Sequence, residues 1–198
     1  ISRFLQLIKY SSRLSFYLLF LIALPVFLES DYILSIWLVE VPDTASYFLR
    51  FIMYYSLFRV SNVSVIKGVH ATGNIKFLNL SSGLYSATTF LTSIYICYKL
   101  GAPFWACFVV QGFNGFLITY FELKSLYKNV RFNIREFIKE IYFIPWCIVI
   151  LGSIIPTLLT IWINPCFIRL CLTTVVSILT TIFVIYFLGL SKSERIFV

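Results

Sequence analysis

Charged side chains are scarce in this sequence, and their scarcity excludes most soluble folds. Only 12% of the 198 residues are Asp, Glu, Lys or Arg, whereas an ordinary soluble domain carries about 25%. Hydrophobic residues reach 60%, aromatic residues 19%, and the mean hydropathy is +0.93. A surface of this composition suits lipid as its solvent and does not suit water. We therefore expect an all-α integral membrane protein.

Signatures of catalysis and metal binding are also missing. The sequence has no H-E-x-x-H, P-loop or G-x-S-x-G motif. Glu29 and Asp31 are the only acidic pair that could serve sugar transfer, and their place between two apolar stretches suits that role poorly. His70 is the single histidine, and it fits the edge of a loop better than a proton switch. The five cysteines lack zinc or redox spacing, so we expect free thiols. We predict no enzyme activity, no cofactor and no metal.

Long runs without charge predict membrane-spanning helices, because about 20 mainly apolar residues cross ~30 Å of hydrocarbon. A less obvious run begins at Pro42 and Asp43, which suit the first turn of a helix. Two stretches that mix apolar and basic residues are expected as short interfacial helices, at 2–12 and 132–140. The prediction is one six-helix domain over residues 1–198, with spans at 13–29, 43–66, 77–98, 103–123, 141–163 and 168–190.

The net charge of +8 suggests either a nucleic-acid partner or an orienting role, and its distribution favours the second. Most basic residues fall on one side of the six predicted spans, as the positive-inside rule requires. This places both ends of the chain in the cytoplasm, and we expect no nucleic-acid partner. The outer segments hold only Lys99 and Arg169, while the inner segments hold Arg3, Lys9, Arg13, Lys67, Lys76, Lys124, Lys128, Arg131, Arg135, Lys139, Lys192 and Arg195.

The span at 43–66 carries the strongest polar signal. Arg50 would lie about 12 Å past Pro42 and Arg59 about 25 Å past it, on opposite faces of the helix. A charge at membrane depth costs about 2.5–3.5 kcal/mol on insertion scales. Either the two arginines meet an anionic substrate, or each pairs with a carbonyl or acidic residue of another helix or snorkels to the interface. The candidate substrate-binding residues are Arg50, Arg59, Tyr55, Asn62 and Gln111.

Several short segments, taken in their order along the chain, carry a resemblance. They are RLSFYLL at 13–19, ALP at 23–25, ESDYILSIWL at 29–38, VP at 41–42, FLR at 48–50, ATGNIK at 71–76, KLGAP at 99–103 and GLSKSER at 189–195. Together they resemble the C-terminal part of bacterial polysaccharide-biosynthesis proteins, which are lipid-linked oligosaccharide (O-antigen) flippases related to the multidrug and toxin extrusion (MATE) transporters. The likeness covers nearly the whole chain.

The resemblance implies a fold and a function. The six spans would form one lobe of a two-lobe, MATE-like transporter, and the N-terminal lobe of the same polypeptide would be missing from this chain. The implied activity is movement of an isoprenoid-pyrophosphate-linked oligosaccharide across the bacterial inner membrane for lipopolysaccharide and other surface polysaccharides. The implied partners are that substrate and membrane lipids.

Two other functions remain open. A multidrug or cation antiporter of the same superfamily would need an acidic residue deep in a helix. The deepest acid, Glu122, falls close to the inner edge of its span. A non-transporting membrane scaffold subunit would need the second, third and fourth helices to pack without a cavity.

Overall fold

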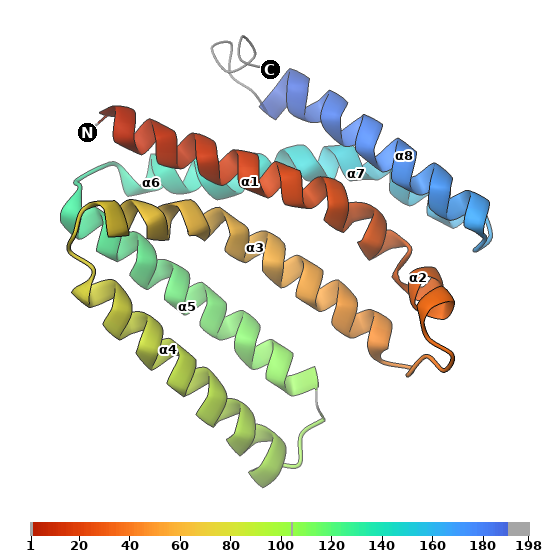
Figure 1. Ribbon diagram of the computed structural model, residues 1–198, viewed down its shortest axis with the longest axis horizontal. Coiled ribbons are helices and arrows are strands. Elements are labelled where there is room, and N and C mark those ends of the chain that lie inside the picture. The colour runs from red at the N-terminus through yellow and green to blue at the C-terminus, as the bar shows by residue number, and fades with distance from the viewer. Residues whose placement is uncertain (1, 104, 190–198) are drawn as a thin grey trace. The chain divides into compact units, whose positions relative to one another are not determined.

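The computed structural model of the chain describes residues 2–103 and 105–189, and every regular element within them is helical. Figure 1 follows these elements in chain order. The helices are α1 (Ser2–Leu28), α2 (Ser30–Trp37), α3 (Ala45–Ala71), α4 (Lys76–Ile94), α5 (Trp105–Asn129), α6 (Ile134–Ile138), α7 (Ile144–Trp162) and α8 (Phe167–Val184). Three π-helical turns continue helices: η1 (Tyr95–Lys99), η2 (Lys139–Phe143) and η3 (Ile185–Gly189). The expected all-α fold is confirmed.

Four helical segments of the described chain are long and apolar enough to cross a membrane. They are Arg3–Leu28, Trp105–Asn129, Ile134–Trp162 and Phe167–Gly189. The predicted spans at 43–66 and 77–98 also form helices, α3 and α4. Their composition is more polar, since α3 carries Arg50, Arg59 and Lys67, and α4 is rich in Ser and Thr. The chain therefore has four candidate spans by composition, and six spans remain a prediction.

The helix limits differ from expectation at places where the sequence has no helix-breaking residue. The predicted interfacial helix at 2–12 runs without interruption into the first span, as the 27-residue α1. The predicted helix at 132–140 likewise begins at Ile134 and continues through η2 into α7. Pro145 cannot donate a hydrogen bond to the preceding turn, and the wider turn η2 lies directly before it. The segment after Glu29, expected as part of a loop, forms the short helix α2.

The described residues group into two compact units, and the single six-helix lobe stays a prediction. Unit 1 comprises residues 2–12, 58–103 and 105–134, and unit 2 comprises residues 13–57 and 135–189. Helices α1 and α3 each contribute one part to each unit. In unit 1, α4 and α5 lie side by side as a hairpin (Figure 1). The unit 1 core includes the buried side chains of Ile8, Val65, Val69, Leu78, Ile118, Leu123 and Leu126.

Aromatic side chains and a glycine organise unit 2. Phe16 is fully buried and meets Trp146 edge-on, with 5.2 Å between ring centroids. The hairpin of α7 and α8 packs closely at Gly152, whose carbonyl accepts a 3.1 Å hydrogen bond from the Thr180 hydroxyl. A Cβ at Gly152 would lie 3.5 Å from the Thr181 backbone, which is an ordinary contact. There is room for one methyl group at this position and little more.

This packing predicts a size threshold at Gly152. We expect Gly152→Ala to be tolerated, and Gly152→Leu to lower the free energy of unfolding by about 1–3 kcal/mol, because the larger side chain forces α7 and α8 apart. The measurement is thermal unfolding of the purified full-length protein in detergent. Gly83→Leu is the matched control, since a Cβ at Gly83 meets nothing within 4 Å and leucine favours a helix. Equal losses in the two leucine variants would refute the packing role.

Candidate functional site

Arg59 of α3 forms a two-pronged ion pair with Glu122 of α5 inside unit 1. Its two terminal nitrogens lie 3.0 Å from Oε2 and 2.8 Å from Oε1 of the carboxylate. Glu122 is only 1% exposed. Asn62 donates a 2.8 Å hydrogen bond to the Thr119 hydroxyl, which lies 3.4 Å from Arg59. The paired residues are three positions apart on each helix, so they share a face and meet as a set.

This cluster holds α3 against α5. A buried carboxylate is stable only when its charge is matched and its oxygens accept hydrogen bonds. The planar guanidinium meets both needs of Glu122, because it donates to both oxygens at once. The Thr119 hydroxyl also donates to the Gly115 carbonyl of its own helix, at 2.9 Å. Of the two roles that the sequence leaves open for Arg59, the geometry matches the structural one.

A second buried ion pair, in unit 2, joins residues 140 positions apart. Arg169 of α8 donates to Oε2 of Glu29 from two nitrogens, at 2.6 and 3.2 Å. The Thr173 hydroxyl donates to Oε1 of the same carboxylate at 3.1 Å. Glu29 is 1% exposed and Arg169 8% exposed. Arg169 also donates to the Ile163 carbonyl at 2.9 Å, which satisfies an acceptor at the end of α7.

Sequence reasoning missed this pair because it assigned Glu29 and Arg169 to outer segments. One signal was available: Arg169 is the only charged residue between Ile141 and Ser191. A lone arginine in so apolar a stretch requires a partner. Nothing in the sequence identifies Glu29 as that partner, since the choice depends on how α1 and α8 meet.

Arg50 of α3 forms the third ion pair, which is more exposed to solvent than the other two. Its guanidinium lies 2.6 Å from Asp31 Oδ2 at the start of α2, and it donates to the Phe27 carbonyl at 3.3 Å. The side chains of Arg50 and Asp31 are 31% and 70% exposed. Both partners thus stay accessible, and an ion pair of this kind contributes little stability. Arg50 is therefore held in place and remains available to a competing anion.

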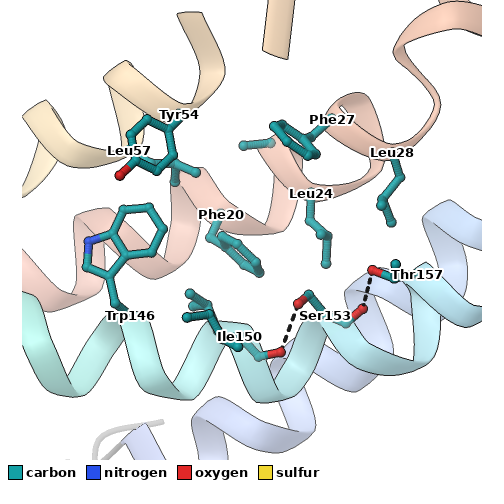
Figure 2. A pocket seen from close by; sticks show the side chains of 12 residues that line it. Phe20, Leu24, Phe27, Leu28, Tyr54, Leu57, Trp146, Ile150, Ser153 and Thr157 are labelled. Atoms are coloured by element: carbon teal, nitrogen blue, oxygen red, sulfur yellow. Dashed lines mark hydrogen bonds between the residues drawn. The ribbon is translucent and has the colours of Figure 1, made fainter. Parts of the chain in front are cut away.

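An apolar pocket of about 190 Å³ lies in unit 2, close to Arg50. Figure 2 shows side chains from α1, α3 and α7 around it. The two hydroxyls on its α7 wall donate to that helix's own backbone, Ser153 to Ile150 and Thr157 to Ser153, both at 2.8 Å. The donor protons of both hydroxyls are therefore already used within α7. The pocket is lined by Phe20, Ala23, Leu24, Phe27, Leu28, Tyr54, Leu57, Trp146, Val149, Ile150, Ser153 and Thr157.

A more polar recess of about 430 Å³ adjoins this pocket, and Leu28 lines both. Asp31, Tyr32 and Arg169 contribute its polar surface. Arg50 lines neither space itself, but it contacts one lining residue of each: it donates to the carbonyl of Phe27, which lines the pocket, and pairs with Asp31, which lines the recess.

The five predicted binding residues are divided between the two units. Arg59 and Asn62 lie together around Thr119 in unit 1. Gln111, also in unit 1, is half-buried on α5 about 12 Å before Thr119 along the helix. Arg50 belongs to unit 2, as does the half-buried Tyr55, whose ring stacks on Phe51 with 6.5 Å between centroids. In the described part of the chain, no group of three His, Cys, Asp or Glu side chains could hold a metal ion.

Comparisons with known proteins add no relative. No family model matches the chain, and neither the curated proteins nor the solved structures yield a match. The likeness to the flippases consequently rests on the sequence segments quoted above, and the function must be argued from the geometry of each unit.

The two arginines of α3 predict contrasting effects on stability. We expect Arg59→Ala to lower the free energy of unfolding by about 3 kcal/mol, because Glu122 would remain buried without a partner. We expect Arg50→Ala to cost less than about 1 kcal/mol, because Asp31 is largely exposed to solvent. Thermal unfolding in detergent measures both variants.

The double variant Arg59→Met with Glu122→Leu provides the control for that pair. Replacing both charges should recover most of the stability that Arg59→Ala loses, because no unpaired carboxylate remains. Equal losses in Arg59→Ala and Arg50→Ala would contradict the assignment of Arg59 to structure.

Proposed function

We propose that this chain is part of a flippase that moves an isoprenoid-pyrophosphate-linked oligosaccharide across the bacterial inner membrane. The supporting observation is the position of Arg50 in unit 2: it contacts Phe27, which lines the apolar pocket, and Asp31, which lines the polar recess. Such a substrate joins an isoprenoid chain, a diphosphate and a sugar. The substrate class is the one that the resemblance to the polysaccharide flippases implies.

The apolar pocket suits a segment of the isoprenoid chain. Its walls are aromatic and aliphatic, including Phe20, Tyr54 and Trp146. Its volume of about 190 Å³ holds a portion of a long chain, so the rest would remain in the surrounding lipid. Weak and partial binding of this kind suits a transporter, because the substrate must leave as readily as it enters.

Arg50 is the residue that we assign to the diphosphate. A guanidinium donates to phosphate oxygens in the same forked geometry as to a carboxylate. A diphosphate carries more charge than Asp31 and would displace it, since the existing pair is solvent-exposed and weak. The recess beyond Asp31 offers Tyr32 to sugar hydroxyls. No covalent bond changes in this process, so the protein would act as a transporter and not as an enzyme.

The two alternative functions receive less support from the geometry. A cation antiporter needs a deep carboxylate, and Glu29 and Glu122 are both 1% exposed. Each already accepts hydrogen bonds from an arginine, so neither presents a bare carboxylate to a cation. A scaffold needs closely packed helices, yet a pocket of about 330 Å³ lies between α4 and α5, lined by Ser81, Tyr85 and Asn114 among others. One lobe of a MATE-like, two-lobe protein remains our proposal for the architecture.

The function is tested in the full-length protein, in a strain whose surface polysaccharide depends on it. We expect Arg50→Ala to lower surface polysaccharide at least about tenfold, with unchanged protein in the membrane, because a bidentate contact to the diphosphate is lost. Arg50→Lys should restore part of the activity, since it keeps the charge. Arg59→Ala should also lower polysaccharide, but together with the protein level.

Lys99→Ala is the matched control, because it removes an exposed cation at the end of η1. It should leave polysaccharide unchanged. Wild-type polysaccharide in both arginine variants would refute the flippase assignment. Accumulation of lipid-linked oligosaccharide on the cytoplasmic side in Arg50→Ala would identify the transport step as the one that fails.

A further inference from the structure

Two cysteines of unit 1 lie closer together than their sequence spacing suggests. The sulfur atoms of Cys97 in η1 and Cys107 in α5 are 3.0 Å apart, and the residues are ten positions apart. Both side chains are half-buried, so each thiol is partly shielded by the protein and partly accessible. The remaining cysteines, Cys147, Cys166 and Cys171, all belong to unit 2.

The turn between α4 and α5 brings the two sulfur atoms together. Gly101 has a φ of +61°, a conformation that reverses the chain and that glycine adopts without strain. The amide of Ala102 donates to the Ile96 carbonyl at 3.3 Å and closes the turn. Cys97 precedes this turn and Cys107 follows it, so the backbone itself fixes their approach. The widened π-helical turn that contains Cys97 places it toward α5.

The separation fits a disulfide better than a shared metal ion. Two thiolates bound to one zinc ion at about 2.3 Å in tetrahedral geometry lie about 3.8 Å apart. The two thiols here are closer, and among the described residues no third His, Cys, Asp or Glu completes a metal site. A disulfide bond measures about 2.05 Å. A movement of about 1 Å by the two side chains would therefore form it.

We infer that Cys97 and Cys107 form an intramolecular disulfide that ties the end of α4 to the start of α5. The positive-inside rule places the loop that follows Lys99 on the extracytoplasmic side, where disulfides persist. The inference rests on this orientation, which the proposed function shares. The disulfide would close the hairpin of α4 and α5 at the end opposite to the Arg59–Glu122 pair.

The oxidant is a disulfide of the extracytoplasmic compartment, carried by a protein or a small molecule. The thiolate of one cysteine attacks a sulfur of that disulfide, and one half of the oxidant leaves as a thiol. The second cysteine loses its proton, attacks the mixed disulfide and releases the other half as a thiol. Two cysteine thiols are oxidised, one external disulfide is reduced, and both protons end on the released thiols.

Differential alkylation of the full-length protein in native membranes tests this inference. Membranes are denatured in ordinary N-ethylmaleimide, which caps free thiols, then reduced and treated with deuterated N-ethylmaleimide. Mass spectrometry should find the deuterated label on Cys97 and Cys107 and the ordinary label on Cys147, Cys166 and Cys171. The ordinary label on both Cys97 and Cys107 would overturn the inference.

The variant Cys97→Ser distinguishes an intramolecular bond from one to another thiol. In this variant Cys107 should carry the ordinary label, because its partner is gone. A deuterated label on Cys107 in the variant would overturn the pairing. The serine replacement is close in size, and the three unit 2 cysteines report in the same sample that alkylation was complete.

The disulfide can be absent while the proposed transport function holds, and the transport function can be wrong while the disulfide is present. Lys99→Cys, made with Cys97→Ser and Cys107→Ser, should react with a membrane-impermeant maleimide added outside intact cells, which establishes the orientation of the loop. Labelling there, with no disulfide in the native chain, would refute the disulfide and leave the orientation standing. The polysaccharide measurement on Arg50 and Arg59 variants decides the transport function separately.

Discussion

A guanidinium that leaves water must find an acceptor for its charge and its hydrogen bonds, and this requirement organises both units. Three arginines in the helical segments each meet a carboxylate from another helix. Arg59 links α3 to α5, Arg169 links α8 to the end of α1, and Arg50 links α3 to α2. Each unit is thus held by apolar packing together with one ion pair whose carboxylate is buried.

The degree of burial separates two of the ion pairs, Arg59–Glu122 and Arg169–Glu29, from the Arg50–Asp31 pair. Glu122 and Glu29 are each 1% exposed, and the removal of either partner would leave a buried charge that costs several kcal/mol. Asp31 is 70% exposed on its side chain, so Arg50 loses little when that carboxylate is replaced by another anion. The same residue chemistry therefore yields two pairs with a buried carboxylate and one pair that stays accessible to solvent.

The sequence predicts the helices well because apolar runs and helix-terminal residues are local signals. The helix expected at 43–66 is present in spite of its arginines, but it begins at Ala45, so Pro42 and Asp43 precede its first turn and do not form it. The pairing of Glu29 with Arg169 could not be predicted, since it joins residues 140 positions apart and depends on tertiary packing. The grouping of residues into two compact units depends on tertiary packing in the same way, because α1 and α3 each contribute one part to each unit.

Charge pairing also explains why α3 is too polar to be counted as a candidate span by composition and is still compatible with a membrane protein. Hydropathy counts Arg50 and Arg59 as two full charges. Each of these charges is matched by a carboxylate from another helix, so the pair exposes less charge to its surroundings than the residue types suggest. A helix with partners on two faces needs little lipid-facing surface, and its own composition can therefore be polar. The residues that make α3 look least like a span are the ones that pair with Asp31 of α2 and Glu122 of α5.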